Sequence, residues 1–241
     1  MDEQLKTTLR NIHNSLKWLW QIVMGLSLAA AGKAYAESLV NLQSGIELHF
    51  LLVLFVLTFF RYLIGNARYL DERYVEFIYD IDGMEEGPEK EKFIKERTSK
   101  LSGRRQLFDY AVLTVTGIMF LLLGNLVTNP NKFTNVYLFL YFINIAFLVI
   151  SVVWNTYIEK NKDSLAMALV FKSYSYEKYP VIWIINNSAF LALYYLLLEY
   201  FPINLAFYFF VIIFIANSLV DIYFVWEMYF PKLSIEKHRT K

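Results

Sequence analysis

Residues 48–64 read LHFLLVLFVLTFFRYLI, an apolar run in which Arg61 is the only Lys, Arg, Asp or Glu. A helix needs about 20 residues to cross a hydrocarbon core about 30 Å thick, so a run of this kind predicts a membrane span. Similar runs lie on both sides of it along the chain. We predict six spans, at residues 18–36, 48–64, 108–127, 135–157, 181–200 and 203–225.

The composition favours the same class of protein. Of the 241 residues, 57% are hydrophobic and 18% are aromatic, which is more apolar surface than a soluble fold of this length can bury. The net charge of +1 gives no overall attraction to nucleic acid, so no nucleic-acid partner is expected. The chain has no cysteine, which excludes disulfides, thiolate nucleophiles and thiolate metal sites.

The basic residues sort to one side of the predicted spans. Of 23 Lys and Arg residues, only Lys33 and Lys132 fall on the other side. Short cytoplasmic loops of membrane proteins collect Lys and Arg, so both termini are predicted to be cytoplasmic. The expected fold is therefore an all-α polytopic membrane protein, with residues 1–241 forming one six-helix transmembrane domain. Its expected surroundings are the lipid bilayer of a cell membrane, and the bias toward Asn, Lys, Ile, Tyr and Phe favours a bacterial cytoplasmic membrane.

The first span is the weakest of the six, because it contains Gln21 and Lys33. A model with five spans would place the basic N-terminal tail outside the cell, which the charge rule disfavours. Small residues recur on one helical face of this span at spacings of three and four, and such faces let helices approach closely in lipid. We interpret that face as a packing surface; it consists of Gly25, Ala29, Gly32 and Ala36.

Residues 66–107 form the only sizeable polar segment between two spans. The helix of the second span is predicted to continue into it, up to a break at Gly83-Met-Glu-Glu-Gly-Pro88. Pro88 suits the first turn of a second helix, which is expected to run toward the third span. We therefore expect a cytoplasmic helical hairpin. It is interpreted first as a solvated, charged hairpin, and alternatively as a docking surface for a protein partner or for anionic lipid headgroups.

The common catalytic signatures are absent from the sequence. It contains no His-Glu-x-x-His motif, no glycine-rich phosphate loop and no nucleophile elbow. The three histidines, His13, His49 and His238, fall on different segments and cannot form one site. We therefore expect no catalytic residue, no metal site and no cofactor.

Polar residues inside the spans are the more informative signal. In the fourth span they recur every three or four residues and form one stripe, and the 1.5 Å rise of a helix places most of the polar groups in the cytoplasmic half of the bundle. The residues expected to line a polar vestibule are Asn144, Ser151, Asn155, Asn186, Asn187, Asn217 and Asp221. The charges expected at its mouth are Arg61, Asp109 and Glu227, with Arg61 pairing with Asp109 or Asp221.

Two interpretations of these residues stay open. They line a water-filled path, because polar groups inside membranes often mark ion or substrate routes, or they fasten helices to one another by hydrogen bonds. Our leading hypothesis is a homo-oligomeric ion channel or transporter with a vestibule that faces the cytoplasm. The alternative is a non-conducting sensor, scaffold or stress-response subunit that recruits a partner through residues 66–107. A membrane-embedded enzyme ranks third, because no nucleophile and base are paired in the sequence.

Overall fold

A computed structural model describes residues 3–41, 45–99, 103–153, 179–202 and 205–224 of the protein, and every regular element within these ranges is helical. The elements are α1 (Glu3–Val40), α2 (Ile46–Leu70), the π-helix η1 (Asp71–Glu76), α3 (Phe77–Asp82), α4 (Pro88–Ser99), α5 (Gly103–Leu126), α6 (Pro130–Val153), α8 (Tyr179–Tyr200) and α9 (Ala206–Phe224).

Five helices of the described chain are long and apolar enough to cross a membrane. They are α2, α5, α6, α8 and α9, and they coincide with the second to sixth predicted spans. The predicted all-α fold is therefore confirmed for the described residues, and these five helices are consistent with the predicted membrane protein. The first predicted span lies within α1, which is not among the five, so the sixth crossing stays a prediction.

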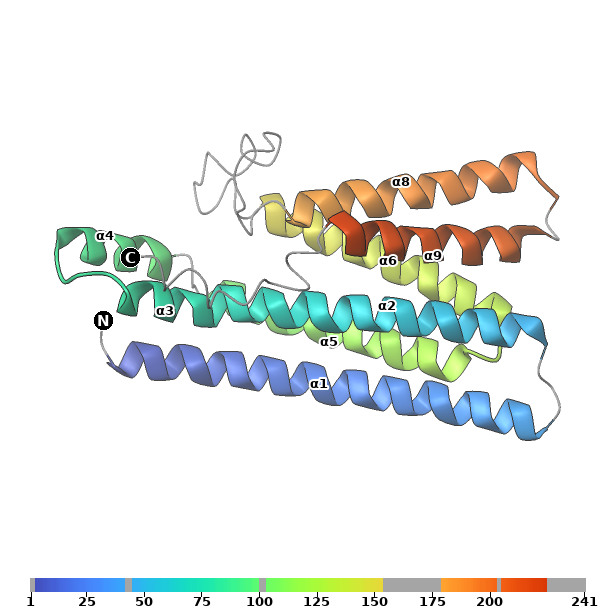
Figure 1. Ribbon diagram of the computed structural model, residues 1–241, viewed down its shortest axis with the longest axis horizontal. Helices are drawn as coiled ribbons and strands as arrows, with labels where there is room; N and C mark the ends of the chain where they lie inside the picture. Colours follow the sequence, from blue (N-terminus) through green and yellow to red (C-terminus); the bar gives the residue numbers. More distant parts are fainter. Residues whose placement is uncertain (1–2, 42–44, 100–102, 154–178, 203–204, 225–241) are drawn as a thin grey trace, which may run out of the picture.

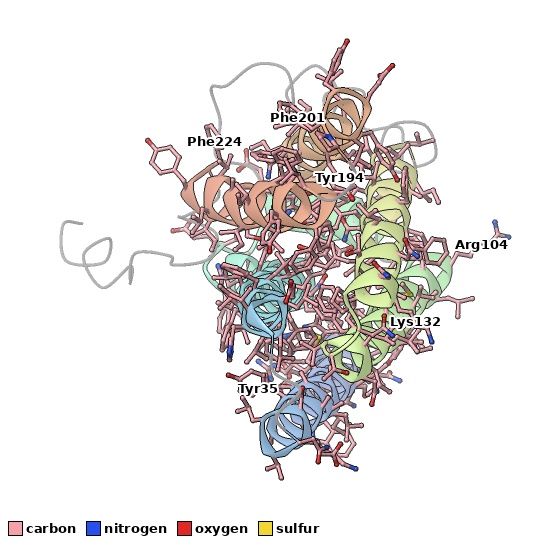
Figure 2. The ribbon with its side chains drawn as sticks, turned by 90° about the vertical axis from the view of Figure 1, so that its right-hand side faces the viewer. Tyr35, Arg104, Lys132, Tyr194, Phe201 and Phe224 are labelled. Atoms are coloured by element: carbon pink, nitrogen blue, oxygen red, sulfur yellow. The ribbon has the colours of Figure 1, made fainter. Side chains whose placement is uncertain are left out.

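The helices pack as two groups that lie side by side (Figure 1). Helix α1 packs against α2 and α5, and α6 packs against α8, which packs against α9. The groups meet where α2 contacts α9 and where α5 contacts α6. Helices α1 and α2, α5 and α6, and α8 and α9 meet at one end of the bundle, whereas α3 and α4 lie at the opposite end. Figure 2 looks along this bundle and shows Tyr194 among the helices and Phe224 pointing away from them.

Helix α1 contacts its neighbours through a different face from the one predicted. Its four small residues at positions 25, 29, 32 and 36 are all exposed in the described chain, so their interpretation as a packing surface within the molecule is wrong. The close approach is made instead by Ser27 and Ala31, which lie directly against Gly124 of α5. A Cβ atom on Gly124 would overlap the backbone carbonyl of Ser27, so only glycine allows this spacing.

The chain stays helical beyond the end of α2. It passes through η1 and α3, turns at residues 83–87, and begins α4 at Pro88. Leu70, Tyr74 and Ile78 follow one another at intervals of four residues and are all buried. A π-helix has a wider turn than an α-helix and is often found at functional sites. Here it keeps these three side chains on the inner face of the helical extension.

Candidate functional site

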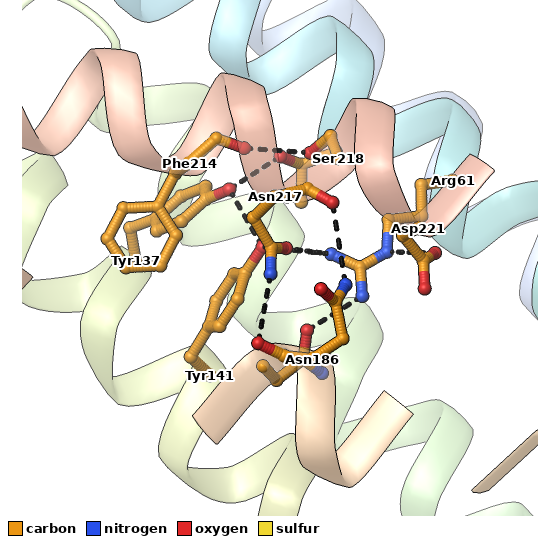
Figure 3. Close-up of polar contacts among 10 residues, drawn as sticks. Arg61, Tyr137, Tyr141, Asn186, Phe214, Asn217, Ser218 and Asp221 are labelled. Carbon is orange, nitrogen blue, oxygen red and sulfur yellow. Dashed lines mark hydrogen bonds and ion pairs between the residues drawn. The ribbon is translucent and has the colours of Figure 1, made fainter. Parts of the chain in front are cut away.

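A buried ion pair lies where the two helix groups meet. Arg61 of α2 is 5% exposed and Asp221 of α9 is 0% exposed. The Arg61 Nε donates a hydrogen bond to Asp221 Oδ2 at 2.6 Å (Figure 3). Asp221 is one of the two partners that the sequence analysis offered for Arg61. Both residues are buried in the bundle, and Arg61 also lines a cavity. The expected role of Arg61 as a charge at a vestibule mouth stays a prediction.

The rest of the Arg61 guanidinium binds uncharged side chains. Its Nη1 donates to the hydroxyl of Tyr141 at 2.9 Å and to Oδ1 of Asn217 at 2.7 Å. Its Nη2 donates to Oδ1 of Asn187 at 2.8 Å. These residues, like Asp221, come from α6, α8 and α9. One side chain of α2 therefore binds all three helices of the other group.

Further hydrogen bonds extend this cluster through the bundle. The Tyr141 hydroxyl donates to Asn217 Oδ1 at 2.8 Å, so this amide oxygen accepts two hydrogen bonds. The hydroxyls of Tyr137 and Thr58 share a hydrogen bond of 2.7 Å. Asn186 and Asn217 each donate a long hydrogen bond to the other's backbone carbonyl, at 3.5 and 3.4 Å. The cluster thus connects α2, α6, α8 and α9.

Aromatic rings of α6 and α9 close the cluster on one side. The Tyr137 ring stacks on those of Phe133 and Tyr141, with centroids 5.8 and 5.1 Å away. Phe210 and Phe214 of α9 meet the Tyr137 ring edge-on at 5.2 Å each. All five rings are buried. They leave the polar groups in surroundings of low polarity, where hydrogen bonds to a charged group are stronger than in water.

Asp109 does not belong to the hydrogen-bonded cluster around Arg61, but it lines the same cavity as Arg61. It lies on α5, is 3% exposed, and accepts hydrogen bonds from the Tyr69 and Tyr74 hydroxyls at 2.9 and 2.7 Å. Its expected role as a charge at a vestibule mouth stays a prediction. Asp109 does not pair with Arg61 through any of these bonds; the two tyrosines tie it to the helix that continues from α2.

A cavity of about 100 Å³ lies beside Arg61, between α2, α5, α6 and α8. Asn144 and Ser151, two of the residues expected in a vestibule, are in its lining. Most of the remaining lining is apolar and aromatic, and includes Phe108, Phe147 and Trp183. The polar stripe of the fourth span thus faces inward, toward the Arg61 cluster at Tyr137 and Tyr141 and toward the cavity at Asn144 and Ser151.

The residues expected in the site have three different outcomes. Asn186, Asn187, Asn217 and Asp221 are brought together around Arg61. Asn144 and Ser151 line the neighbouring cavity. Asn155 and Glu227 lie outside the described residues. Within the described ranges, no group of three or more His, Asp or Glu residues is placed to hold a metal ion.

Sequence reasoning missed several residues of the site, most of them aromatic. Tyr62, Tyr69 and Trp183 line the cavity, and the Thr58 hydroxyl binds Tyr137. Thr58 carried a signal, because it is the only hydroxyl-bearing residue between Phe50 and Arg61. The tyrosines and the tryptophan carried none, since such residues are also common in the packed interior of membrane helices.

Comparison of the chain with known protein families, with curated proteins and with solved structures found no match.

Proposed function

We propose that the protein is a membrane transporter or gated ion channel in which the Arg61–Asp221 pair closes a path between the two helix groups. The single observation that carries this proposal is the ion pair itself, buried between helices that are long and apolar enough to span a membrane. Charged residues inside such helices are costly, and they commonly mark an ion or substrate route.

The contacts of Arg61 favour a closed arrangement over an open vestibule. Its guanidinium binds Asp221, Asn187, Asn217 and Tyr141 at once, so the polar groups that would line a path bind one another. Opening then requires that Asp221 exchange Arg61 for another partner, such as a proton or a permeating cation. Such an exchange would break the contact between α2 and α9. Binding of a proton or a cation at Asp221 would therefore change how the two helix groups sit relative to each other.

The proposal retains the predicted topology. We count α1 as the sixth crossing, because its exposed face between Trp18 and Val40 carries large apolar side chains such as Ile22, Leu26 and Leu39. We also propose a cell membrane as the location, both termini in the cytoplasm, and assembly as a homo-oligomer.

The alternative, a subunit that recruits a cytoplasmic partner, is favoured by one feature. Helix α4 turns Phe93 and Ile94 toward the core and leaves Glu89, Glu91 and Lys92 exposed. A charged helix of this kind, held at one end of the bundle, is suited to docking a protein through residues 66–107. We propose no enzymatic activity for either case.

Ion flux from liposomes tests the leading proposal. The purified protein is reconstituted and flux is measured under potassium, sodium, chloride and proton gradients. Asp221→Asn and Arg61→Gln are each expected to change the rate or the ion preference, because either substitution removes the ion pair. Glu199→Gln is the matched control, since it removes an exposed acidic group near the C-terminal end of α8 that makes no contact with the pair, and it is expected to leave flux unchanged.

Two results would contradict the proposal. One is the absence of flux under every gradient. The other is equal flux from the wild type and both ion-pair variants in well-assembled samples. Either result would mean that the cluster only holds the helices together. The docking alternative would then be tested by capturing cytoplasmic proteins on the full-length chain and on a chain in which residues 83–99 are replaced by a short flexible linker.

A further inference from the structure

The cavity beside Arg61 contains hydrogen-bonding groups that the protein itself does not use. The Tyr62 hydroxyl is buried and has no hydrogen-bond partner within the described chain. Asn66 of α2 and Asn144 of α6 also line the cavity, and neither side-chain amide makes a hydrogen bond within the described residues. Buried polar groups in proteins nearly always have partners, and the Tyr62 hydroxyl is such a group without one. The half-buried amides of Asn66 and Asn144 line the same cavity. Together the three groups indicate a ligand that supplies their partners.

The charged groups in the lining are already matched. Arg61 is paired with Asp221, and Asp109 accepts hydrogen bonds from two tyrosine hydroxyls, one of which belongs to the cavity-lining Tyr69. A charged ligand would have to compete with these short contacts for its counter-charge. An uncharged ligand avoids that competition and needs only the hydroxyl and the two amides.

The rest of the cavity lining indicates that the other part of the ligand is apolar. Phe108, Phe147, Leu148 and Trp183 come from α5, α6 and α8 and present apolar or aromatic surface. A volume of about 100 Å³ is of the same order as the ~150 Å³ apolar cavity that accepts benzene in an engineered protein. The cavity is therefore suited to a molecule built around one ring or a short hydrocarbon chain.

We propose that this cavity binds a small uncharged amphiphile, such as a phenol or a compact alcohol. Its hydroxyl is held by Tyr62, Asn66 and Asn144, and its hydrocarbon part packs on the aromatic side chains. This binding site goes beyond the proposed function, because it requires no transport and is measured without an ion gradient. A failure of the flux experiment therefore leaves it intact, and its own failure leaves the ion-pair proposal intact.

The test compares para-fluorophenol with fluorobenzene, which has the same ring but no hydroxyl. Each probe is titrated into the full-length protein in lipid nanodiscs, bound probe is detected by fluorine NMR, and empty nanodiscs give the partition into lipid. We expect saturable binding of both probes, with para-fluorophenol roughly tenfold tighter, about the effect of one well-placed hydrogen bond.

Three variants connect the binding to the cavity. Asn144→Leu and Asn66→Leu are each expected to reduce the preference for para-fluorophenol several-fold and to spare fluorobenzene. Leu148→Trp fills the cavity and is expected to abolish binding of both probes. Asn125→Leu, on an exposed position of α5, is the control and is expected to bind as the wild type does.

The inference is overturned if both probes only partition as they do into empty nanodiscs, or if they bind equally tightly. It is also overturned if Asn144→Leu and Asn66→Leu, in monodisperse samples, keep the wild-type preference. Should one of these two variants fail to fold, the other and Leu148→Trp still decide the question, because Asn66 and Asn144 lie on different helices and each supplies its own hydrogen bond.

Discussion

At the scale of single residues, Arg61 is suited to its place by the shape of its guanidinium. The group is planar and presents five N–H donors in a fixed fork, so one side chain can bind a carboxylate, two amides and a hydroxyl from different directions. The four bonds of 2.6–2.9 Å that it donates in the bundle use this geometry. A lysine has three N–H donors on a single nitrogen, so it could not make all four of these hydrogen bonds.

The effects of substituting Arg61 and Asp221 on the stability of the protein are expected to be strongly non-additive. Asp221→Leu leaves Arg61 buried without its counter-charge, which typically costs about 3–5 kcal/mol, and Arg61→Met should cost a similar amount. The double variant Arg61→Met with Asp221→Leu removes both charges and is expected to be more stable than either single variant. Thermal unfolding followed by circular dichroism in detergent measures all three proteins. A double variant that loses the sum of the two single effects would show that the charges do not depend on each other.

At the scale of elements, the contact between α1 and α5 depends on the absence of one side chain. Gly124 lies against the backbone of Ser27, and Gly117 lies against the side chain of Val23. These two glycines are seven residues apart on α5, which is about two helical turns, so they lie on the same face of the helix. The close approach of the two helix axes at this seam permits the extended dispersion contacts on which association of helices in lipid relies.

The same chemical change is therefore expected to have opposite effects at two glycines. Gly124→Ala forces α1 away from α5 and should lower the thermal midpoint of unfolding. Gly32→Ala points into open space and should be neutral or stabilising, because alanine favours a helix by up to about 1 kcal/mol over glycine. Unfolding curves of the two variants, measured side by side with the wild type, decide the matter. Equal effects at both positions would contradict the close packing of α1 on α5.

Most of the long helices could be predicted in order from the sequence, because a long apolar run by itself identifies a helix that can cross a membrane. Five apolar runs became five long helices, and the polar residues within them became the cluster around Arg61. Which face of each helix packs against its neighbours could not be predicted in the same way. Gly25 and Gly32 formed as good a small-residue pattern as Ser27 and Ala31, and only the position of Gly124 on another helix decides which pair is buried.

Two further features, the π-helix and the cavity, also could not be predicted from the sequence. The π-helix after Leu70 is defined by hydrogen bonds one residue longer than those of an α-helix, and no residue type announces that choice. The cavity arises from imperfect packing among α2, α5, α6 and α8. That Tyr62 and Trp183 line it depends on how these helices are placed relative to one another, and no local motif predicts this.

At the scale of the whole molecule, charged contacts gather at one end of the bundle. Lys6 near the start of α1 pairs with Asp82 at the end of α3, with 2.6 Å between Nζ and Oδ1. His13 and Lys17 of α1 both contact Asp71 of η1, at 2.7 and 3.1 Å. These pairs tie the first turns of α1 to the helical extension of α2. This end therefore depends on ionic contacts, whereas the interior of the bundle depends mainly on packing.

The attachment between α1 and α3 is expected to weaken in acid. The hydrogen bond from Lys6 lowers the pKa of Asp82, and the same bond raises the pKa of Lys6. The pair is therefore complete at neutral pH, and its contribution is lost as the pH falls through the lowered pKa of Asp82. At the alkaline extreme it is lost as the pH rises through the raised pKa of Lys6.

Spin labels on exposed positions of α1 and α3 measure this effect. Their distance distribution should broaden in acid for the wild type. In Asp82→Asn it should be broad at every pH, because the acid-sensitive partner is missing. High salt at neutral pH should act in the same direction, since the pair is partly exposed to solvent. A wild-type distribution that is narrow in acid would contradict the role of this pair.

The bond between Arg61 and Asp221 joins residues 160 positions apart. At a synthesis rate of about 5–20 residues per second, the ribosome takes roughly 8–30 s to make the chain between them. During that time the newborn α2 carries an arginine whose partners on α8 and α9 do not yet exist. The early membrane intermediate must therefore hold this helix near water, phosphate headgroups or an insertion chaperone. A chain that terminates before Asp221 would leave the Arg61 charge without its carboxylate partner.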